Sequence, residues 1–329
     1  MLPIALLGLL GFSLIYYVIS TIVSNRRHAQ KAEQLGCLPT TRRPHKLPFG
    51  IDLVRKIAAA DKENNVPGYL LTTARDEVGA NTWIQQQLGT ELYATAEPKN
   101  IQALLATQFN DFEIGSQRRG AFFPMLGNGI FTSDGKVWEH SRALLRPQFA
   151  RDQVADLDVE EHHVQDLMRH ITVGASGWTD KVDLKPMFFR LTLDSATEFL
   201  FGQSVNSQIA ALPGYKQSAK ESDLDWTAFG PSFDLCTMEL GYRIRLAELY
   251  WIRNTKEFRK GCREIHRFAD YYVNMALNGD IGSVNEKELE SGQKKPKYIF
   301  LEELVKTTRD HTELRSQLLN ILIAGMTSS

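Results

Sequence analysis

The sequence predicts a mainly α-helical protein with one small β element. Apolar residues recur about every 3.6 positions over several long segments, which is the period of a helix with one buried face. Residues 81–96 instead show two apolar stretches around a Gly-Thr pair, as two short strands joined by a turn would. Hydrophobic residues make up 43% of the 329 residues, which is typical of a folded domain and not of a disordered chain.

The first segment, residues 1–24, is predicted to be a membrane anchor. Residues 2–23 carry no charge, and as a helix they would span roughly 33 Å, enough for the hydrocarbon core. A basic cluster at residues 26–31 follows, so the positive-inside rule places the body of the chain on the cytoplasmic side of a single-pass span. The alternative is a cleaved signal peptide, but a basic start is missing and the small-residue cleavage site is poor.

Residues 25–50 are predicted to be a basic, proline-rich hinge, because Pro39, Pro44 and Pro48 resist helix formation. Residues 51–329 are predicted to form one partial domain. Helix signals in it include the capping residue Asp134 and glycines that follow a last turn, and the polar residues 279–297 are expected to form a loop. The expected helices are 54–60, 69–77, 97–105, 134–146, 153–171, 186–201, 301–309, 313–325 and, as one long helix, 238–277.

Composition excludes several function classes. The net charge of −1 lacks the basic surplus of nucleic-acid-binding proteins, so we expect no nucleic-acid partner. The three cysteines, Cys37, Cys236 and Cys262, form no Cys-x-x-Cys pair and predict neither a zinc ribbon nor a disulfide framework. Cys262 lies on an apolar stripe and is expected in the core. The acidic and histidine-rich residues 160–166 are expected to be a solvated helix face and not a metal site.

One segment carries most of the functional information. Trp138 and Arg142 are four residues apart and therefore share a helix face. Trp offers one N–H donor, and Arg offers five N–H donors on a planar guanidinium. Together they suit a ligand that carries carboxylates on a flat apolar body. Arg146 extends the same stripe. The alternative is a tryptophan packed in the core with an arginine lying over it.

Three stretches together resemble the cytochrome P450 family, most closely its fungal microsomal alkane and fatty-acid hydroxylases. The resemblance implies the N-terminal two-thirds of a P450 fold, preceded by a transmembrane helix and ending at the start of helix I. The stretches are Gly127-x-Gly129-Ile130-Phe131-x-x-Asp134-Gly135-x-x-Trp138-x-x-x-Arg142 with Arg146-Pro147-x-Phe149 for helix C, residues 191–202 for helix E, and residues 314–325 for the start of helix I.

The resemblance also implies a function. It predicts a haem-thiolate monooxygenase that inserts oxygen into long-chain alkanes or fatty acids and takes electrons from NADPH through a cytochrome P450 reductase. It places the protein in the endoplasmic reticulum membrane. Trp138 and Arg142 would bind the haem propionates, and Ala324 and Gly325 would begin the oxygen-binding helix.

By the same resemblance, the phenylalanine-rich loop 109–131 would line the substrate pocket. Its walls would suit a long apolar chain, and plain core packing is the alternative. The residues predicted to form these walls are Phe122, Phe123, Met125 and Leu126.

The sequence departs from the family pattern at its end. In the family, Ala-Gly of helix I is followed by an acidic residue and a threonine, whereas Met326 follows Gly325 here. None of the three cysteines lies in a ligand loop with glycine and phenylalanine, so the axial thiolate is expected to be absent from this chain and no metal ligand is assigned. We therefore expect an inactive, truncated fragment of such an enzyme. The alternative is a non-catalytic, membrane-bound helical remnant or interaction protein.

Overall fold

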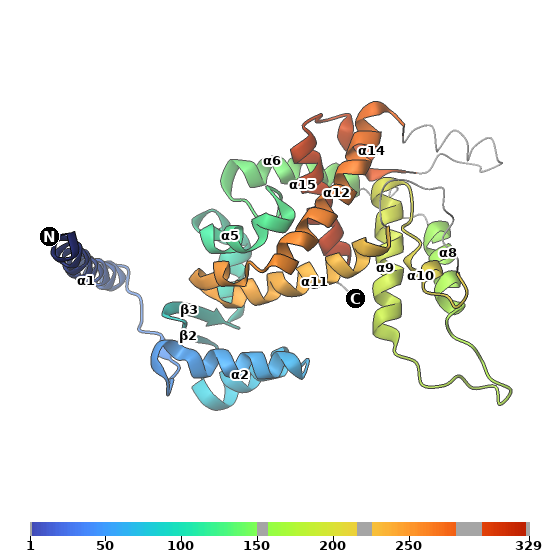
Figure 1. The fold of residues 1–329 in the computed structure, drawn as a ribbon. Helices are drawn as coiled ribbons and strands as arrows, with labels where there is room; N and C mark the ends of the chain where they lie inside the picture. The colour runs from blue at the N-terminus through green and yellow to red at the C-terminus, as the bar shows by residue number, and fades with distance from the viewer. Residues whose placement is uncertain (1, 150–156, 216–225, 281–297, 327–329) are drawn as a thin grey trace. The chain divides into compact units, whose positions relative to one another are not determined.

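The structure, a computed structural model, describes residues 2–149, 157–215, 226–280 and 298–326. These residues are mainly helical, with one small three-stranded sheet, which confirms the predicted fold class (Figure 1). The chain forms two compact units, residues 1–107 and 108–329. The predicted boundaries after residues 24 and 50 remain predictions. Residues 281–297 of the predicted loop 279–297, the start of the predicted helix 153–171 and the tail 327–329 lie outside the described residues.

The first unit joins a long helix to a small sheet with short helices. Its elements are α1 (Leu2–Gln34), β1 (Thr41–Arg42), η1 (Pro48–Gly50), α2 (Ile51–Lys62), α3 (Val66–Thr72), η2 (Thr73–Val78), β2 (Thr82–Gln87), β3 (Thr90–Thr95), α4 (Pro98–Gln102) and η3 (Ala103–Thr107).

The predicted hairpin is confirmed. Strands β2 and β3 are antiparallel, and Gln87 pairs with Thr90 across a two-residue turn. Both turn residues have positive φ, 51° at Leu88 and 90° at Gly89, as a tight hairpin turn requires.

The predicted hinge takes part in the same sheet. Strand β1 runs parallel to β2, and the buried side chain of Arg43 donates from Nε to Glu77 Oε2 over 2.9 Å. Residues 41–43 therefore belong to the first unit.

Helix α1 extends past the predicted end of the anchor at residue 24. Among the described residues, no helix combines the length and the hydrophobicity that crossing a membrane requires. The anchor predicted for residues 1–24 accordingly has no support from the structure.

The described part of the second unit is mainly helical and contains no strand beyond one isolated bridge, between Val173 and Thr179. Its elements are η4 (Phe109–Asp111), α5 (Gly115–Leu126), α6 (Gly135–Leu145), η5 (Arg146–Phe149), α8 (Leu157–Met168), α9 (Leu184–Phe201), α10 (Ser207–Ala210), α11 (Trp226–Arg245), η6 (Ala247–Arg253), α12 (Lys256–Asn278), α14 (Phe300–Val305) and α15 (His311–Met326).

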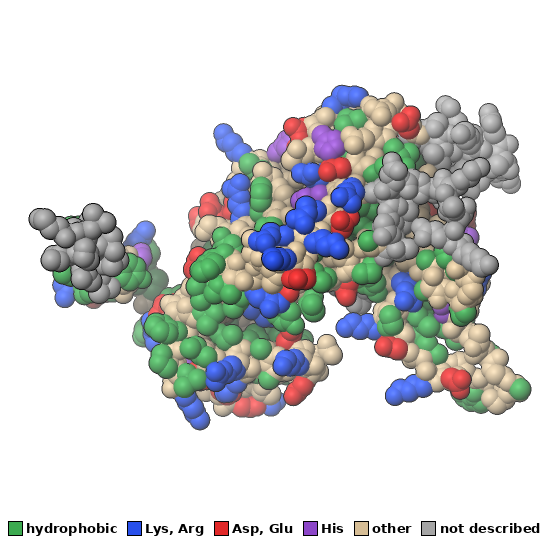
Figure 2. Space-filling view, in the orientation of Figure 1, with side chains coloured by type: hydrophobic (Ala, Val, Ile, Leu, Met, Phe, Trp, Pro, Cys, Tyr) green, Lys and Arg blue, Asp and Glu red, His purple; other side chains and the backbone are tan. Residues whose placement is uncertain are grey.

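Helix α12 lies at the centre of this unit and packs against α5, α11, α14 and α15 (Figure 1). Its buried face supplies Phe268 and Tyr272 to an aromatic cluster, in which Tyr272 stacks on Phe201 of α9 at 4.4 Å between ring centroids and Phe268 on Phe229 of α11 at 3.8 Å. Its opposite face is exposed and basic, and Figure 2 shows Lys and Arg side chains over this part of the surface. The helix thus packs its apolar face against the core and turns its charged face to solvent.

The prediction of a single helix over 238–277 is wrong. Helix α11 ends at Arg245, and Ala247 adopts a left-handed conformation with φ 51°. Helix α12 then begins directly after Thr255, whose Oγ1 accepts a hydrogen bond of 3.1 Å from the Phe258 N–H. The apolar spacing of the two helices continues across this break, which is why periodicity alone does not reveal it. The capping threonine is the missed signal.

Two further expectations need correction. The segment 109–131 is not a loop, since it contains the twelve-residue helix α5. On α8, the predicted solvated polar face is wrong for His163 and Asp166, which are buried, while the apolar Val164 and Met168 are exposed. His163 turns inward because its Nε2 lies 2.5 Å from Glu198 Oε2 on α9, forming an ion pair when the ring is protonated.

Candidate functional site

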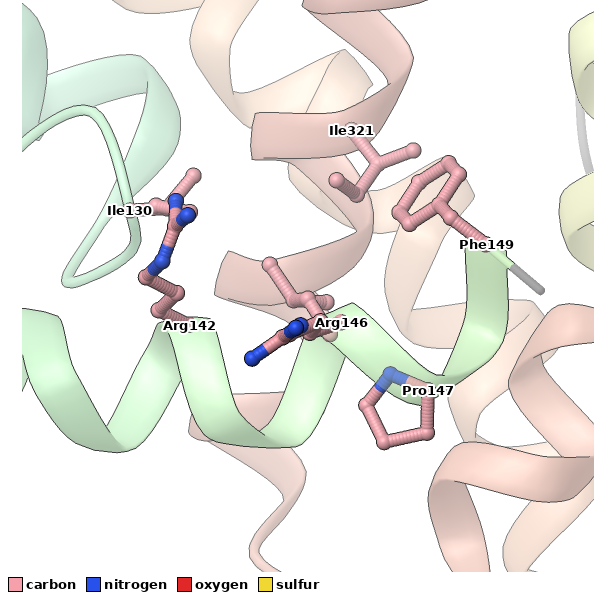
Figure 3. A pocket seen from close by; sticks show the side chains of 7 residues that line it. Ile130, Arg142, Arg146, Pro147, Phe149 and Ile321 are labelled. Carbon is pink, nitrogen blue, oxygen red and sulfur yellow. The ribbon is translucent and has the colours of Figure 1, made fainter.

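An open hollow of about 600 Å³ lies between α6, η5 and α15 (Figure 3). Apart from two arginines its walls are apolar. Arg142 extends from α6 toward Ile130, and Ile321 of α15 lies on the same wall as Phe149. The side chains that line it are Ile130, Arg142, Leu145, Arg146, Pro147, Phe149 and Ile321.

The loop that carries Ile130 is shaped by two glycines. A Cβ on Gly127 would lie 2.3 Å from Ser316 Oγ, and a Cβ on Gly129 would lie 2.2 Å from Asn320 Nδ2. Contacts this short are excluded for real side chains, so the loop approaches α15 closely only because both positions lack one. The Gly-x-Gly pattern at this place therefore reflects close packing.

Asn320 fixes the same loop by hydrogen bonds. Its Oδ1 accepts from the Phe131 N–H at 3.0 Å, and its Nδ2 donates to Leu126 O at 3.1 Å and to Ser316 O at 2.8 Å. The side chain is fully buried, so each of these bonds replaces contacts with water that burial removed. Ile130 is thereby held on the wall of the hollow.

Helix α6 is also held in place by side chains of other elements. Gln317 Nε2 of α15 donates to Ser141 Oγ over 2.8 Å in the buried contact between the two helices. Asp134 occupies the N-cap position of α6 as predicted, but its carboxylate makes no bond to α6. It accepts instead from Ile114 N at 2.8 Å and Gly115 N at 3.1 Å, the first N–H groups of α5. The aspartate thus caps the neighbouring helix and joins its start to that of α6.

Trp138 and Arg142 lie together on α6, as the spacing predicts. The Arg142 guanidinium carbon is 5.4 Å from the centre of the Trp138 ring, a distance that allows a cation–π contact. The indole also packs on Phe109 at 5.1 Å between centroids. Arg142 lines the hollow, whereas Trp138 stands next to it and is not among the lining side chains.

The donors at this site have no acceptors in the part of the chain that the structure describes. Neither Arg142 nor Arg146 forms an ion pair or donates a side-chain hydrogen bond there, and the Trp138 indole N–H makes none. Two guanidinium groups at the edge of an apolar surface can bind carboxylates at one end of a flat, otherwise apolar ligand.

Curated proteins of known class resemble this chain along nearly its whole length, although no protein-family model matches it. The chain is 46% identical over 323 residues to cytochrome P450 monooxygenase g430 of Fusarium sp., which covers 98% of the chain and 56% of that protein. It is 41% identical over 322 residues to cytochrome P450 52A12 of Debaryomyces hansenii, covering 98% and 58%. Over 236 residues it is 48% identical to cytochrome P450 52A5 of Candida maltosa, covering 71% and 42%.

The chain belongs to the cytochrome P450 family. This confirms the family predicted from the helix-C, helix-E and helix-I stretches. The chain spans a little over half the length of the first curated relatives it matches. Cytochromes P450 are haem-dependent oxidoreductases, and the Fusarium relative is named a monooxygenase.

The P450 cofactor, haem, is a flat apolar ring with two propionate groups. The chemical character of the side chains that line the hollow fits this group. The wall of the hollow is apolar and carries two cations without acidic partners in the described part. The predicted pair, Trp138 and Arg142, is at this place, and Arg146 adds a second guanidinium.

The residues predicted to line a substrate pocket are not brought together at the hollow. Met125 and Leu126 are fully buried in the core of the second unit, and Phe122 packs against that core beneath Arg118. Phe123 is 45% exposed on α5. The predicted pocket remains a prediction, and for Met125 and Leu126 the geometry agrees with the alternative of core packing.

Ala324 and Gly325 lie in the last turn of α15, about one turn beyond Ile321. A Cβ on Gly325 would lie 3.7 Å from that of Ala196 on α9, which is an ordinary contact. Their predicted catalytic role remains a prediction.

Metal ligands are not gathered anywhere in the described residues: no three His, Cys, Asp or Glu side chains lie close enough to hold an ion. None of the three cysteines lines the hollow. Cys37 is exposed in the first unit, and Cys236 and Cys262 are buried in the second.

Sequence reasoning missed the residues that build the site from a distance. Asn320, Gln317 and Ile321 reach the helix-C region from α15, and only the resemblance of residues 314–325 to helix I points to that helix. Polar residues within an apolar helix, as Gln317 and Asn320 are, would have been a usable signal, because buried polar groups need partners.

Proposed function

We propose that the protein to which this chain belongs is a haem-dependent monooxygenase, and that this chain supplies the wall of the haem pocket that binds the propionates. One observation carries the proposal. Arg142, Arg146 and the Trp138 indole are neighbouring donors without acceptors in the described part, at the edge of an apolar hollow. The P450 relatives supply the cofactor that such a surface fits.

Haem, when bound, supplies the iron at which dioxygen is activated. The residues of this chain bind and orient it. Arg142 and Trp138 hold carboxylate oxygens, and Arg146 offers a second cation at the same edge. Ile130, Leu145 and Ile321 contact the apolar body and exclude water.

The geometry of these groups is fixed before any ligand arrives. Trp138 is held by Phe109, α6 is tied to α15 through Ser141 and Gln317, and the Ile130 loop is tied to Asn320. A site whose supporting residues are locked in this way loses less entropy on binding.

Haem binding and oxygen chemistry are separable in this proposal. The family's chemistry needs a cysteine thiolate bound to the iron, and no cysteine of this chain lines the hollow. We therefore expect these 329 residues by themselves to bind haem and to show no monooxygenase turnover.

Titration of the chain with hemin, followed by absorbance, tests the proposal. We expect saturable binding. Arg142→Ala should weaken it by at least about ten-fold, since a hydrogen bond to a charged group contributes about 1.5–3 kcal/mol. Trp138→Phe removes the N–H donor and keeps the ring, so it should weaken binding less.

Lys136→Ala is the matched control. Lys136 is an exposed cation on the same helix, and it does not line the hollow. Equal losses in Lys136→Ala and Arg142→Ala would point to general charge attraction and contradict a defined propionate site. A titration without saturation would contradict the proposal as a whole.

The substrate and the redox partner follow from the sequence resemblance. We propose long-chain alkanes or fatty acids as substrates and an NADPH-dependent cytochrome P450 reductase as electron donor. A longer form of the protein that carries the axial cysteine, reconstituted with such a reductase, should hydroxylate these chains. Failure with every chain length, despite a bound haem, would contradict the substrate class.

A single-pass location in the endoplasmic reticulum membrane rests on the sequence of residues 1–24 alone. No described helix supports it. Retention of the chain in the membrane pellet after alkaline carbonate extraction is the expected result, and release into the supernatant would reject it. Deletion of residues 1–24 is the matched control.

A further inference from the structure

Two cysteines meet at the contact between α11 and α12, away from the hollow. Cys236 Sγ lies 3.9 Å from Cys262 Sγ, and both side chains are buried, at 0% and 6% exposed. Cys236 Sγ also lies 3.7 Å from Phe258 O on α12. These two thiols are therefore close neighbours although 26 residues separate them in sequence.

A glycine makes this approach possible. A Cβ on Gly261 would lie 2.6 Å from Cys236 Sγ, so any other residue there would push the sulfur away from α12. Cys262 follows directly in the sequence. The small residue and the two thiols thus form one close contact between the helices.

A buried cation lies beside the pair. Arg243 is two helical turns beyond Cys236 on α11, hence on the same side, and it is 2% exposed. Its guanidinium donates to Ala121 O at 2.7 Å and Gly120 O at 3.0 Å and lies 4.9 Å from the centre of the Phe258 ring. In the described part it has no acidic partner; nearby Glu239 pairs with Arg253.

The two thiols are not equivalent. The hydrogen bond between the two thiols lowers the pKa of Cys262 against the effect of burial, and the charge of Arg243 lowers it further. The same hydrogen bond and burial raise the pKa of Cys236. Cys262 is also the one with some exposed surface, so it is the better nucleophile of the two.

We propose that Cys236 and Cys262 form an oxidative modification site, at which a peroxide converts the two thiols to a disulfide that joins α11 to α12. The Cys262 thiol releases its proton, and the thiolate attacks one oxygen of hydrogen peroxide. The O–O bond breaks, the sulfur becomes a sulfenic acid, and the departing hydroxide takes up the released proton to give water. The Cys236 thiol then attacks this sulfur and expels a second water. In sum, two thiols and one hydrogen peroxide give one disulfide and two waters.

The geometry needs only a small adjustment. A disulfide requires the sulfurs to approach to about 2.05 Å, so they must close by about 2 Å from their separation of 3.9 Å. The third cysteine, Cys37, is exposed and in the other unit. Competition from it is removed experimentally by Cys37→Ser.

Peroxide treatment of the folded Cys37→Ser chain tests the site. After unfolding in N-ethylmaleimide and digestion with trypsin, we expect peptide 261–263 linked to peptide 221–243, with a mass 2 Da below the sum of the free pair, and both thiols restored by dithiothreitol. Recovery of both cysteines as alkylated thiols would overturn the proposal, as would separate sulfinic acids without a cross-link.

Single variants test the order of the steps. In Cys236→Ala, dimedone should trap a sulfenic acid at Cys262. In Cys262→Ala, labelling of Cys236 should be roughly ten-fold lower, because Cys236 is fully buried whereas Cys262 has some exposed surface. Equal labelling would overturn the assignment of Cys262 as the attacking group. The cross-link experiment keeps the native pair, so its result does not depend on the folding of either variant.

Discussion

The amide of Asn320 occupies the space that a side chain at Gly129 would need. A Cβ built on Gly129 would lie 2.2 Å from Asn320 Nδ2. Asn320 is fully buried and holds the N–H of Phe131, two residues beyond that glycine. The fit of loop to helix therefore depends on a missing side chain at one position and an amide at the other.

Gly129→Ala should destabilise the protein. The added methyl would displace Asn320 from its three hydrogen bonds or move the loop, and overpacking of this kind costs about 1–3 kcal/mol. The free energy of unfolding from urea titrations measures the effect. Hemin affinity should fall with it, since Ile130 moves with the loop.

Gly241→Ala is the control for this variant. Gly241 lies inside α11, and its added Cβ would meet Arg245 Nη1 at an ordinary 3.6 Å. Alanine favours a helix interior over glycine by about 1 kcal/mol, so stability should be unchanged or higher. Equal losses in the two variants would contradict the crowding argument at Gly129.

His163 should stabilise the second unit more at low pH. Burial lowers its pKa, but the nearby carboxylates of Glu198, Asp194 and Glu160 outweigh that effect, and the pKa lies above its ordinary value of 6.5. The stabilisation is therefore complete below 6.5 and is lost as the pH rises through the folded-state pKa. Urea unfolding across this range measures it, and Glu198→Gln should flatten the profile. A profile as steep in that variant would exclude the His163 ion pair as the cause.

His266 should behave in the opposite way. Burial lowers its pKa below 6.5, and the charge of Arg315 adds to this, while its Nε2 lies 2.8 Å from Met125 O as a neutral ring N–H donor would. Its contribution is present above 6.5 and is lost as the pH falls through the folded-state pKa. The ring-proton signals in an NMR titration should show His163 titrating above His266. The reverse order would be incompatible with both environments.

Met125→Ala and Phe123→Ala should separate core packing from a substrate role. Met125 is fully buried, so its truncation should cost about 2–5 kcal/mol. Phe123 is 45% exposed, so truncating it should lower the free energy of unfolding much less. In a longer, haem-loaded form of the protein, Phe123→Ala should shift the preferred chain length if the predicted pocket exists. An unchanged product profile would reject Phe123 as a pocket residue.

Elements whose signals are local could be predicted from the sequence. Helix α9 ends where expected because Gly202 adopts a left-handed φ of 78° directly after the last turn. The hairpin was predictable because Gly89 supplies the positive φ that its turn requires. In both cases one residue type has a backbone freedom that others lack.

Elements that depend on distant partners were harder to predict. The polar His163 faces inward because Glu198 on another helix compensates its burial, and no spacing rule within α8 contains that information. The break between α11 and α12 was missed because apolar residues continue through it at helical spacing, while its cause lies in Ala247 and Thr255.

The candidate site likewise has one part that local sequence predicts and another that depends on distant residues. The Trp138–Arg142 pair follows from a four-residue spacing, so the sequence alone predicts that the two side chains share a helix face. The hollow beside it also needs Ile321, and the loop that shapes it needs Asn320, both far along the chain. Three-dimensional contact alone makes these residues part of the site.

The hydrogen bond between Phe131 and Asn320 also limits when this part of the protein can fold during synthesis. Its partners are 189 residues apart, and a ribosome adding about 5–20 residues per second needs about 10–40 s to make the residues between them. During that interval the Gly127–Gly129 loop has left the ribosome while the helix that completes it does not yet exist. The haem-side wall therefore cannot become native until residue 320 has been made, and the loop stays accessible to chaperones until then.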